Sequence, residues 1–148
     1  MRKILKLIII SIVLSSCGYN PILVNKETNL SIKEFISTGD KKISKKIISN
    51  LKALEKNDGD FIVTIKPIYK TDIASKDKKG NPATYVTTLN VEFTIEGNDI
   101  KKSSNFREST TYNNQSSKFK LKQNEDKLRL NMINKISEDI MIFVLSLK

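Results

Sequence analysis

The stretch from Tyr85 to Ile95 constrains the fold more than any other part of the sequence. Every second residue in it is apolar or aromatic, with one threonine as the exception: Tyr85, Thr87, Leu89, Val91, Phe93 and Ile95. Because successive side chains of a strand point to opposite faces, this alternation predicts a long strand with one buried face and one face in solvent.

Two further segments have apolar residues at steps of three and four, which is the spacing of one face of a helix. Residues 41–54 carry Ile43, Ile47, Ile48, Leu51 and Leu54, and residues 123–147 carry Leu128, Met132, Ile133, Ile136, Ile140, Phe143, Val144 and Leu147. Asp40 stands where an N-cap is expected. We expect Gly59 to end the first helix with a positive φ.

Three weaker patterns complete the list of expected elements. A short strand is predicted over residues 30–36, with Ile32 and Ile36 on one face, and another begins at Phe61. Because proline has no N–H to donate, Pro67 argues against a central ladder position there, unless a bulge removes the need for that N–H. Residues 100–112 form a poorer pattern, interrupted by Glu108, which suggests an edge strand or an irregular one.

The order strand, helix, strand, strand, strand, helix predicts an α+β fold in two layers. Two amphipathic helices would pack on one face of a four-stranded mixed or antiparallel sheet. The turns between the long strands fall at residues 75–82 and at Gly97-Asn98-Asp99, and a polar linker is expected over residues 113–122.

The first 17 residues have the layout of a bacterial lipoprotein signal. Arg2, Lys3 and Lys6 precede a short apolar run from Leu7 to Leu14, and Ser15-Ser16-Cys17 follows it. The run is too short to span a bilayer as a stable helix, and the small serines suit a peptidase pocket. Two other interpretations are a plain signal peptide with a nearby free cysteine and a buried N-terminal strand or helix.

The lipoprotein interpretation divides the chain into a signal peptide (residues 1–16), a lipidated tether (17–29) and one domain (30–148). Cys17 is the only cysteine of the 148 residues, so acylation would leave no thiol for a disulfide. In proteobacterial lipoproteins an aspartate after the cysteine commonly signals retention at the inner membrane. Gly18 therefore favours the outer membrane, on its periplasmic face.

The charge and composition narrow the classes of function. The predicted mature chain has 23 basic and 16 acidic residues, a net charge of +7, which favours anionic partners. The export signal disfavours nucleic acid. Because the sequence contains no histidine, it excludes a histidine-based triad, acid–base pair or metal site. No cofactor motif is found, and we expect a protein that is not an enzyme.

Three short motifs resemble the lipopolysaccharide-assembly lipoprotein family LptE. The opening Cys17-Gly18-Tyr19-Asn20-Pro21 is similar to the start of that family, and Lys79-Gly80-Asn81-Pro82-Ala83-Thr84-Tyr85 looks like its central hairpin. Tyr112-Asn113-Asn114, then a polar linker and Gln123-Asn124-Glu125, resembles the approach to its final helix. The similarity covers nearly the whole predicted mature chain in element order.

The resemblance implies an outer-membrane lipoprotein that sits as a plug inside the β-barrel of LptD. Members help that barrel to assemble and assist the delivery of lipopolysaccharide, and they are not enzymes. It also implies that Lys78 or Lys79, and Lys122, bind phosphates of the glycolipid, a contact that charge-assisted hydrogen bonds would stabilise. Lysine cannot make the planar, two-pronged contact of an arginine there.

A different periplasm-facing lipoprotein, a lipid carrier or an envelope scaffold, is the alternative. An apolar cavity would favour the carrier, since acyl chains need a dry pocket. Both hypotheses leave the roles of two surfaces undecided. The lysines of residues 41–52 could meet phosphates or only solvent, and Met141, Ile142 and Leu145 could belong to the core or face lipid or a partner.

Overall fold

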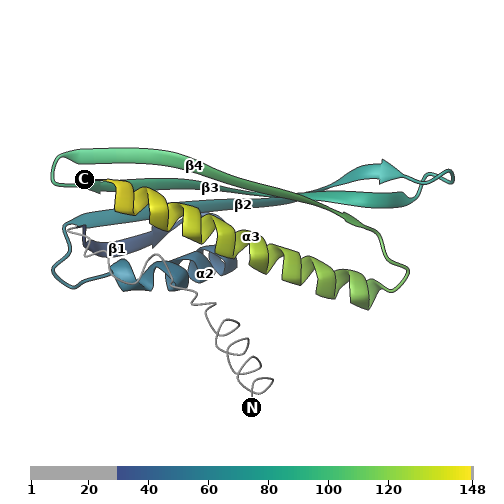
Figure 1. Cartoon of the computed structure of the whole chain (residues 1–148), viewed down its shortest axis with the longest axis horizontal. Coiled ribbons are helices and arrows are strands. Elements are labelled where there is room, and N and C mark those ends of the chain that lie inside the picture. The colour runs from purple at the N-terminus through teal and green to yellow at the C-terminus, as the bar shows by residue number, and fades with distance from the viewer. Residues whose placement is uncertain (1–29, 148) are drawn as a thin grey trace, which may run out of the picture.

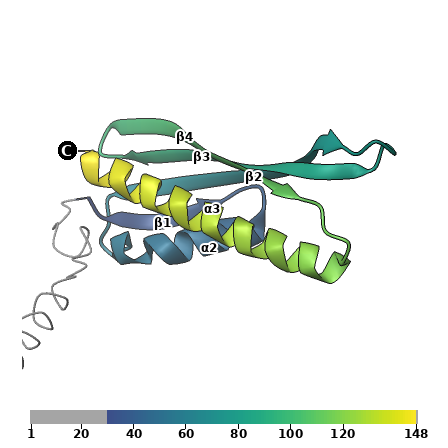
Figure 2. The same cartoon turned by 45° about the vertical axis from the view of Figure 1, so that its right-hand side comes forward.

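Four strands and two helices form two layers in the computed structural model, which describes residues 30–147 (Figure 1). The strands are β1 (Ile32–Ser37), β2 (Phe61–Lys76), β3 (Pro82–Gly97) and β4 (Ile100–Asn113). The helices are α2 (Lys41–Leu51), extended by the 3-10 turn η1 (Lys52–Leu54), and α3 (Lys118–Ser146). Both helices lie on the same face of the sheet (Figure 2).

The strands follow one another across the sheet in the order β1-β2-β3-β4. β1 is parallel to β2, and the two later pairs are antiparallel. A parallel pair needs a crossover, which α2 supplies, whereas tight turns suffice for the antiparallel pairs. The predicted α+β class and mixed sheet are confirmed.

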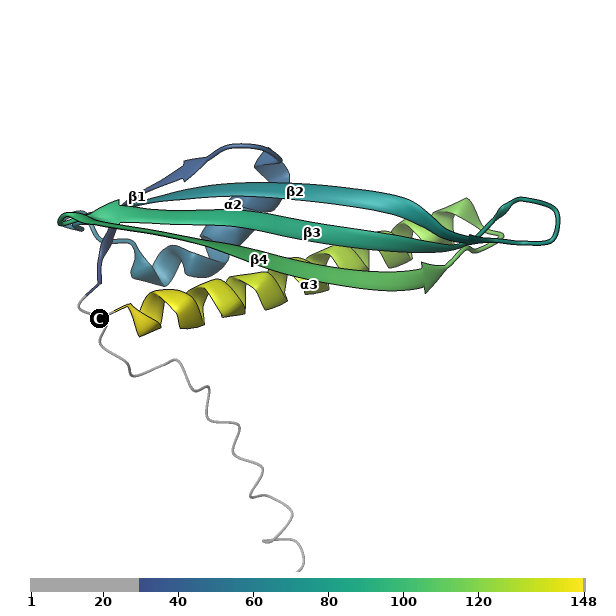
Figure 3. The same ribbon diagram turned by 90° about the horizontal axis from the view of Figure 1, so that it is seen from above.

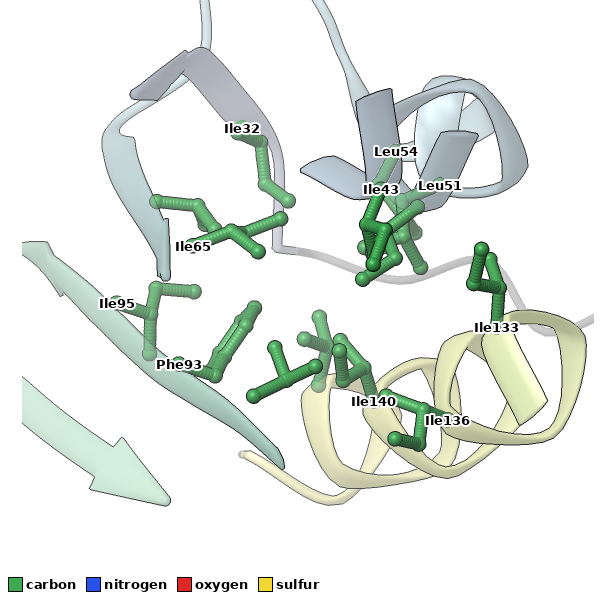
Figure 4. Close-up of a cluster of buried hydrophobic side chains, with 14 of the residues drawn as sticks. Ile32, Ile43, Leu51, Leu54, Ile65, Phe93, Ile95, Ile133, Ile136 and Ile140 are labelled. Atoms are coloured by element: carbon green, nitrogen blue, oxygen red, sulfur yellow. The ribbon is translucent and has the colours of Figure 1, made fainter. Parts of the chain in front are cut away.

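The core lies between the first part of the sheet and the helices, where isoleucine, leucine and valine side chains from both layers interdigitate (Figure 4). The alternation predicted for β3 is confirmed, because Leu89, Val91, Phe93 and Ile95 are all buried. The helical stripes are confirmed as well. Their fully or nearly fully buried members are Ile43, Ile47, Leu51, Leu54, Met132, Ile133, Ile136, Ile140 and Val144.

The long strands run well past this core. β2 and β3 have 16 residues each, and their far halves continue as a hairpin beyond the apolar part of the sheet (Figure 3). At the other end, Asn98 and Asp99 take φ values of 49° and 60° in a two-residue turn that pairs Gly97 with Ile100. Positive φ at both positions is the geometry of the tightest β-hairpins.

Pro67 lies inside β2, a central strand of the sheet, but beyond Ile65, the last residue of β2 that pairs with β1. It pairs with Val91 of β3, yet its carbonyl oxygen accepts a hydrogen bond from the N–H of Asp40, 3.4 Å away on the β1 side. The N–H and C=O of a strand residue point the same way, so the missing donor faces away from β3. β1 has already ended there, and no ladder bond is lost.

A bulge in β1 corrects the predicted face of that strand. Ile32 pairs with Phe61 but Glu34 already pairs with Ile62, so one extra residue, Lys33, is inserted. Ile36 therefore points outward and is exposed, and Phe35 packs against the core in its place.

Gly59 has a role other than the predicted one. It is not among the residues with positive φ, and the helix has already ended at Leu51. A Cβ atom at Gly59 would lie 2.5 Å from the backbone of Ile32 and Lys33. Glycine is needed here because two backbones approach closely beside the β1 bulge.

The N-terminus of α2 was predicted correctly, and that of α3 was not. The carboxylate of Asp40 accepts hydrogen bonds from the N–H groups of Lys42 (2.9 Å) and Ile43 (3.1 Å). α3 begins at Lys118 instead of residue 123, with Ser117 as its N-cap. The lysine-rich sequence resembles a solvated linker, but it also suits the exposed first turns of a helix.

Ser44 offers a test of how the α2 interface is packed. Its hydroxyl is buried and has no hydrogen-bond partner in the described part of the chain. Removing an unsatisfied polar atom and adding a better helix former should both help, so Ser44→Ala should raise the free energy of unfolding by about 1 kcal/mol. Urea unfolding measures it, with the exposed Ser49→Ala as control for propensity alone. A loss of stability would contradict an unpaired hydroxyl.

Candidate functional site

The turn between β2 and β3 is a structured loop organised by Asp77. The Asp77 carboxylate accepts hydrogen bonds from the N–H groups of Lys79 (2.8 Å) and Asn81 (2.9 Å), and the Asp77 N–H donates to the Asn81 carbonyl (2.8 Å). Gly80 has φ of 83°, which suits glycine. Lys78 and Lys79 are both exposed and are held at the tip of the hairpin.

The same contacts set the charge of Asp77. The backbone N–H of Asn81, more than any other group, holds the pKa of the Asp77 carboxyl below its usual value. A polar, lysine-rich segment such as this one is typical of a flexible tip. The one signal of an ordered turn in the sequence is the spacing of Asp77 before Gly80-Asn81.

Asn114 fixes the base of this hairpin to the end of β4. Its N–H donates to the carbonyl of Ala83 (2.9 Å), and its side-chain amide donates to the carbonyl of Pro82 (2.8 Å). β4 stops one residue earlier, where Asn113 pairs with Thr84. The turn therefore projects past the end of β4, and the Tyr112-Asn113-Asn114 motif has a structural role in aiming it.

Lys122 lies on the second turn of α3. The start of this helix is at the same end of the molecule as the β2–β3 turn (Figures 1 and 2). The Lys122 Nζ is 3.5 Å from Asp126 Oδ1 and 3.9 Å from Glu125 Oε2, while the side chain stays largely exposed. Lys118 and Lys120 are also exposed on the first turn. The structure thus brings the predicted lysines to one end, on two separate elements.

The electrostatics of this end are unusual for a helix start. Acidic residues are favoured at the positive N-terminal end of a helix dipole, but the first turn of α3 contains lysines and no acidic residue. Residues 75–82 and 117–122 together carry six lysines and one aspartate. The like charges of such a surface repel one another, and an anion that binds there relieves this repulsion.

Tyr112 attaches the first half of α3 to the sheet, a role that the sequence did not reveal. Its hydroxyl donates to Glu125 Oε1 at 2.9 Å, and its ring stacks on Tyr85 with centroids 5.6 Å apart. Burial, together with the bond to Glu125, raises the pKa of Tyr112 to about 12. The two rings pair across β3 and β4, a contact that becomes visible only once the register is known.

Glu108 and Tyr69 make further polar contacts with α3. Lys135 Nζ lies 2.5 Å from Glu108 Oε1, and that hydrogen bond raises the pKa of Lys135. The Arg129 guanidinium sits 5.7 Å from the centre of the Tyr69 ring. The sequence suggested an edge strand or an irregular one, and β4 is an edge strand in continuous register, in which the Glu108 carboxylate faces a lysine of the helix.

A substitution at Tyr112 tests this attachment. Tyr112→Phe keeps the stacked ring but removes the donor to Glu125, so the free energy of unfolding should fall by about 1 kcal/mol. The difference should be present below pH 10, the ordinary tyrosine value, and shrink as pH rises to about 12, where the folded phenol ionises. Urea unfolding across this range provides the measurement.

Tyr85→Phe is the matched control for that experiment. The Tyr85 ring belongs to the same stack, but no hydrogen bond of its hydroxyl is seen among residues 30–147. We expect little change in stability from this substitution. Equal effects of the two variants would show that the Glu125 contact contributes nothing.

Cys17 and Gly18, with the predicted signal and tether, lie outside the described residues. Within residues 30–147, neither helix combines the length and apolar character that crossing a bilayer requires.

The fold is shared with solved structures of lipoproteins, although no protein-family model and no curated protein matches the sequence. Rare lipoprotein B from Shewanella oneidensis aligns with a TM-score of 0.55 and 15% identity, over 77% of this chain and 98% of its own. A minor lipoprotein from Acinetobacter baumannii gives 0.56 and 18%, over 77% and 93%. Lipoprotein B from Nitrosomonas europaea gives 0.53 and 12%, over 78% and 81%. The described chain therefore has the fold of these bacterial lipoproteins.

Proposed function

We propose that the protein is an LptE-like lipoprotein, held on the periplasmic face of the outer membrane by an acylated Cys17. In this proposal the lysines of the β2–β3 turn and of the first turns of α3 contact phosphates of lipopolysaccharide. The protein would also serve as plug and assembly partner of an LptD-type barrel. The observation that carries the proposal is the gathering of six lysines at one end of a lipoprotein fold.

The geometry of the turn supports binding of an anion. Because Asp77 and Asn114 fix the hairpin, Lys78 and Lys79 are presented without a large loss of backbone freedom on binding. Phosphate oxygens would also interact favourably with the N-terminus of α3, because the lysine side chains and the positive end of the helix dipole both attract an anion there. The ion pairs of Lys122 are solvent-exposed, so exchanging them for a phosphate costs little.

The packing supports a plug over the alternative of a lipid carrier. Isoleucine, leucine, valine and phenylalanine side chains fill the space between the layers in the described residues, and many of them are fully buried (Figure 4). A carrier needs that space for acyl chains. No helix of residues 30–147 covers the outer face of the sheet, which is rich in threonine, serine and asparagine, a surface suited to a polar barrel interior.

Charge reversal tests the glycolipid contact. Lys78→Glu combined with Lys122→Glu should weaken binding to phosphorylated lipid A about tenfold, since a hydrogen bond to a charged group contributes about 1.5–3 kcal/mol before screening. The loss should be greatest at low salt. Binding to immobilised lipid A at two ionic strengths measures both effects.

Lys45→Glu with Lys46→Glu is the matched control, because both lysines are exposed on α2 and give the same change in net charge. We expect these variants to bind nearly as well as the wild type. An equal loss of lipid A binding in both double variants would show a general effect of net charge and no specific site. Unchanged binding in the Lys78–Lys122 variant would show that these two lysines do not belong to the site.

Affinity capture tests the barrel partnership separately. The tagged, full-length protein, extracted from outer membranes in mild detergent, should bring down one large β-barrel protein in stoichiometric amount. A preparation in which acylated protein is abundant but no barrel accompanies it would count against the plug, and would leave the scaffold or carrier as the better account.

A further inference from the structure

One side of the β4 backbone has no neighbouring strand within residues 30–147. β4 is the last strand of the sheet, and its register with β3 is unbroken from Ile100 to Asn113. In an antiparallel pair, alternate residues direct their N–H and C=O groups toward the neighbouring strand. The N–H of Asn114 donates to the carbonyl of Ala83, so the even-numbered residues of β4 face β3. The residues that direct their backbone groups outward are all exposed: Lys101, Ser103, Asn105, Arg107, Ser109, Thr111 and Asn113.

The other free edges of the sheet are protected against pairing, whereas the edge of β4 is not. β1 is six residues long and contains a bulge. The part of β2 that β1 does not cover contains Pro67, three lysines and two register shifts. Short length, bulges, proline and lysines are the features that keep an edge from adding a further strand. β4 has 14 residues without proline or register shift, and within residues 103–113 its charged residues are Arg107 and Glu108.

α3 provides a layer beneath the space next to this edge. The second half of the helix projects past β4 when the sheet is seen from above (Figure 3). Lys135 reaches Glu108 from the helix, and Ile142 follows Lys135 by two turns, so it lies on the same side of α3. Ile142 is 59% exposed. A strand added to β4 would extend the sheet over this side of the helix and cover an apolar side chain.

We propose that β4 is the docking edge for an added strand, and that this strand is an extended segment of the LptD-type barrel. The inference rests on the proposed plug and names one contact that would join plug and barrel. In strand addition, main-chain hydrogen bonds supply the affinity and alternate side chains supply the specificity. Arg107 is exposed and has no ion pair among residues 30–147, so we expect an acidic residue opposite it on the added strand.

A segment of another protein fits this edge better than a second copy of the chain. Two predicted mature chains of charge +7 repel each other. β4 itself contains three basic residues and one acidic residue, and that residue, Glu108, is already paired with Lys135. A second β4 therefore offers no free carboxylate to Arg107. A plug enclosed by a barrel is also separated from further copies.

Position-resolved cross-linking tests the added strand. A photoreactive amino acid replaces Ser103, Asn105 or Thr111 in the tagged, full-length protein, which is irradiated in outer membranes. Because paired strands rise by nearly the same distance per residue, we expect the cross-linked positions to move along one barrel segment by the same intervals. The control series is on the uncovered part of β2, at Ile68, Lys70 and Asp72, where we expect no such progression.

Three results would overturn the inference. Cross-links from β4 that scatter over several barrel strands would show side-chain contact with the lumen and no added strand. Cross-links between two tagged chains would favour pairing of copies. Both results concern this edge alone, since the barrel can still be recovered with the protein. If no barrel is recovered at all, the proposed plug fails and the inference fails with it.

Two variants at Asn105 separate the backbone from the side chain. The N–H of Asn105 faces away from β3, so Asn105→Pro loses no hydrogen bond within the sheet, and edge strands tolerate proline there. We expect the barrel recovered per tagged molecule to fall about fivefold, the effect of one typical hydrogen bond, and to stay unchanged in Asn105→Ala. Equal recovery with the two variants would overturn the inference. Urea unfolding checks that the proline variant folds, and if it does not, the cross-linking series decides.

Discussion

Replacing Cys17 with serine is expected to remove the protein from the membrane fraction. A thiol is required for acylation, and each buried methylene of an acyl chain contributes about 0.8 kcal/mol, so two or three chains hold the protein almost permanently. Without them the described residues have no span that replaces the anchor. Detergent phase partition and intact mass measure the result, and the wild type should begin at Cys17 with added acyl mass.

Ser15→Ala is the matched control, because alanine keeps a small side chain beside the proposed cleavage site. This variant should be processed and partition as the wild type does. A wild-type mass that includes Met1, or an unmodified thiol at Cys17, would contradict the predicted signal. The glycolipid and barrel proposals would then lose their location, since both need the protein at the outer membrane.

Elements whose own residues carry the whole signal were predictable from the sequence. The alternation of Tyr85–Ile95 and the stripes of α2 and α3 show which side of each element is buried, and these sides meet in the core. Asp40 as N-cap is equally local, since its partners are two and three residues away. Such features do not depend on what lies across the sheet.

The errors and the open alternatives fall where a distant segment decides the outcome. Pro67 is acceptable in a central strand only because β1 has ended beside it, and Gly59 is explained by the backbone of Ile32. Glu108 interrupts the apolar pattern of β4, and the reason is its ion pair with Lys135 of α3. A local sequence pattern contains no information about these partners, so each residue conflicts with the pattern of its own segment.

The candidate site shows the same division. The lysines at positions 78, 79 and 122 stand out in the sequence through charge and motif. Their arrangement depends on Asp77, Asn114 and Tyr112, whose hydrogen bonds join segments up to 32 residues apart. The sequence can therefore suggest the chemistry of the ligand, whereas the register and the packing of α3 determine how the lysines are presented.

Phe93→Ala is expected to have the largest effect on stability. Phe93 is fully buried, and its ring meets Phe106 of β4 and Phe143 of α3 edge to face, with centroids 6.2 and 5.9 Å apart. Phe106 and Phe143 also contact each other at 5.8 Å, so one ring joins both layers. Its removal should cost about 3–5 kcal/mol in the free energy of unfolding, through lost burial and the cavity left behind.

Urea unfolding of the domain in the acylated, detergent-solubilised protein measures this loss as a lower midpoint with an unchanged slope. Phe119→Ala makes the same substitution at a side chain that is 76% exposed, and we expect almost no effect. Because a domain is typically stable by about 5–15 kcal/mol, Phe93→Ala could unfold it entirely, and Phe93→Leu then gives a measurable loss of about 1.5 kcal/mol.

If Phe93→Ala and Phe119→Ala unfold at the same urea concentration, the three-ring contact does not hold the helix layer to the sheet. The alignment of the α3 lysines with the hairpin would then need another explanation, since that contact fixes the far end of the helix.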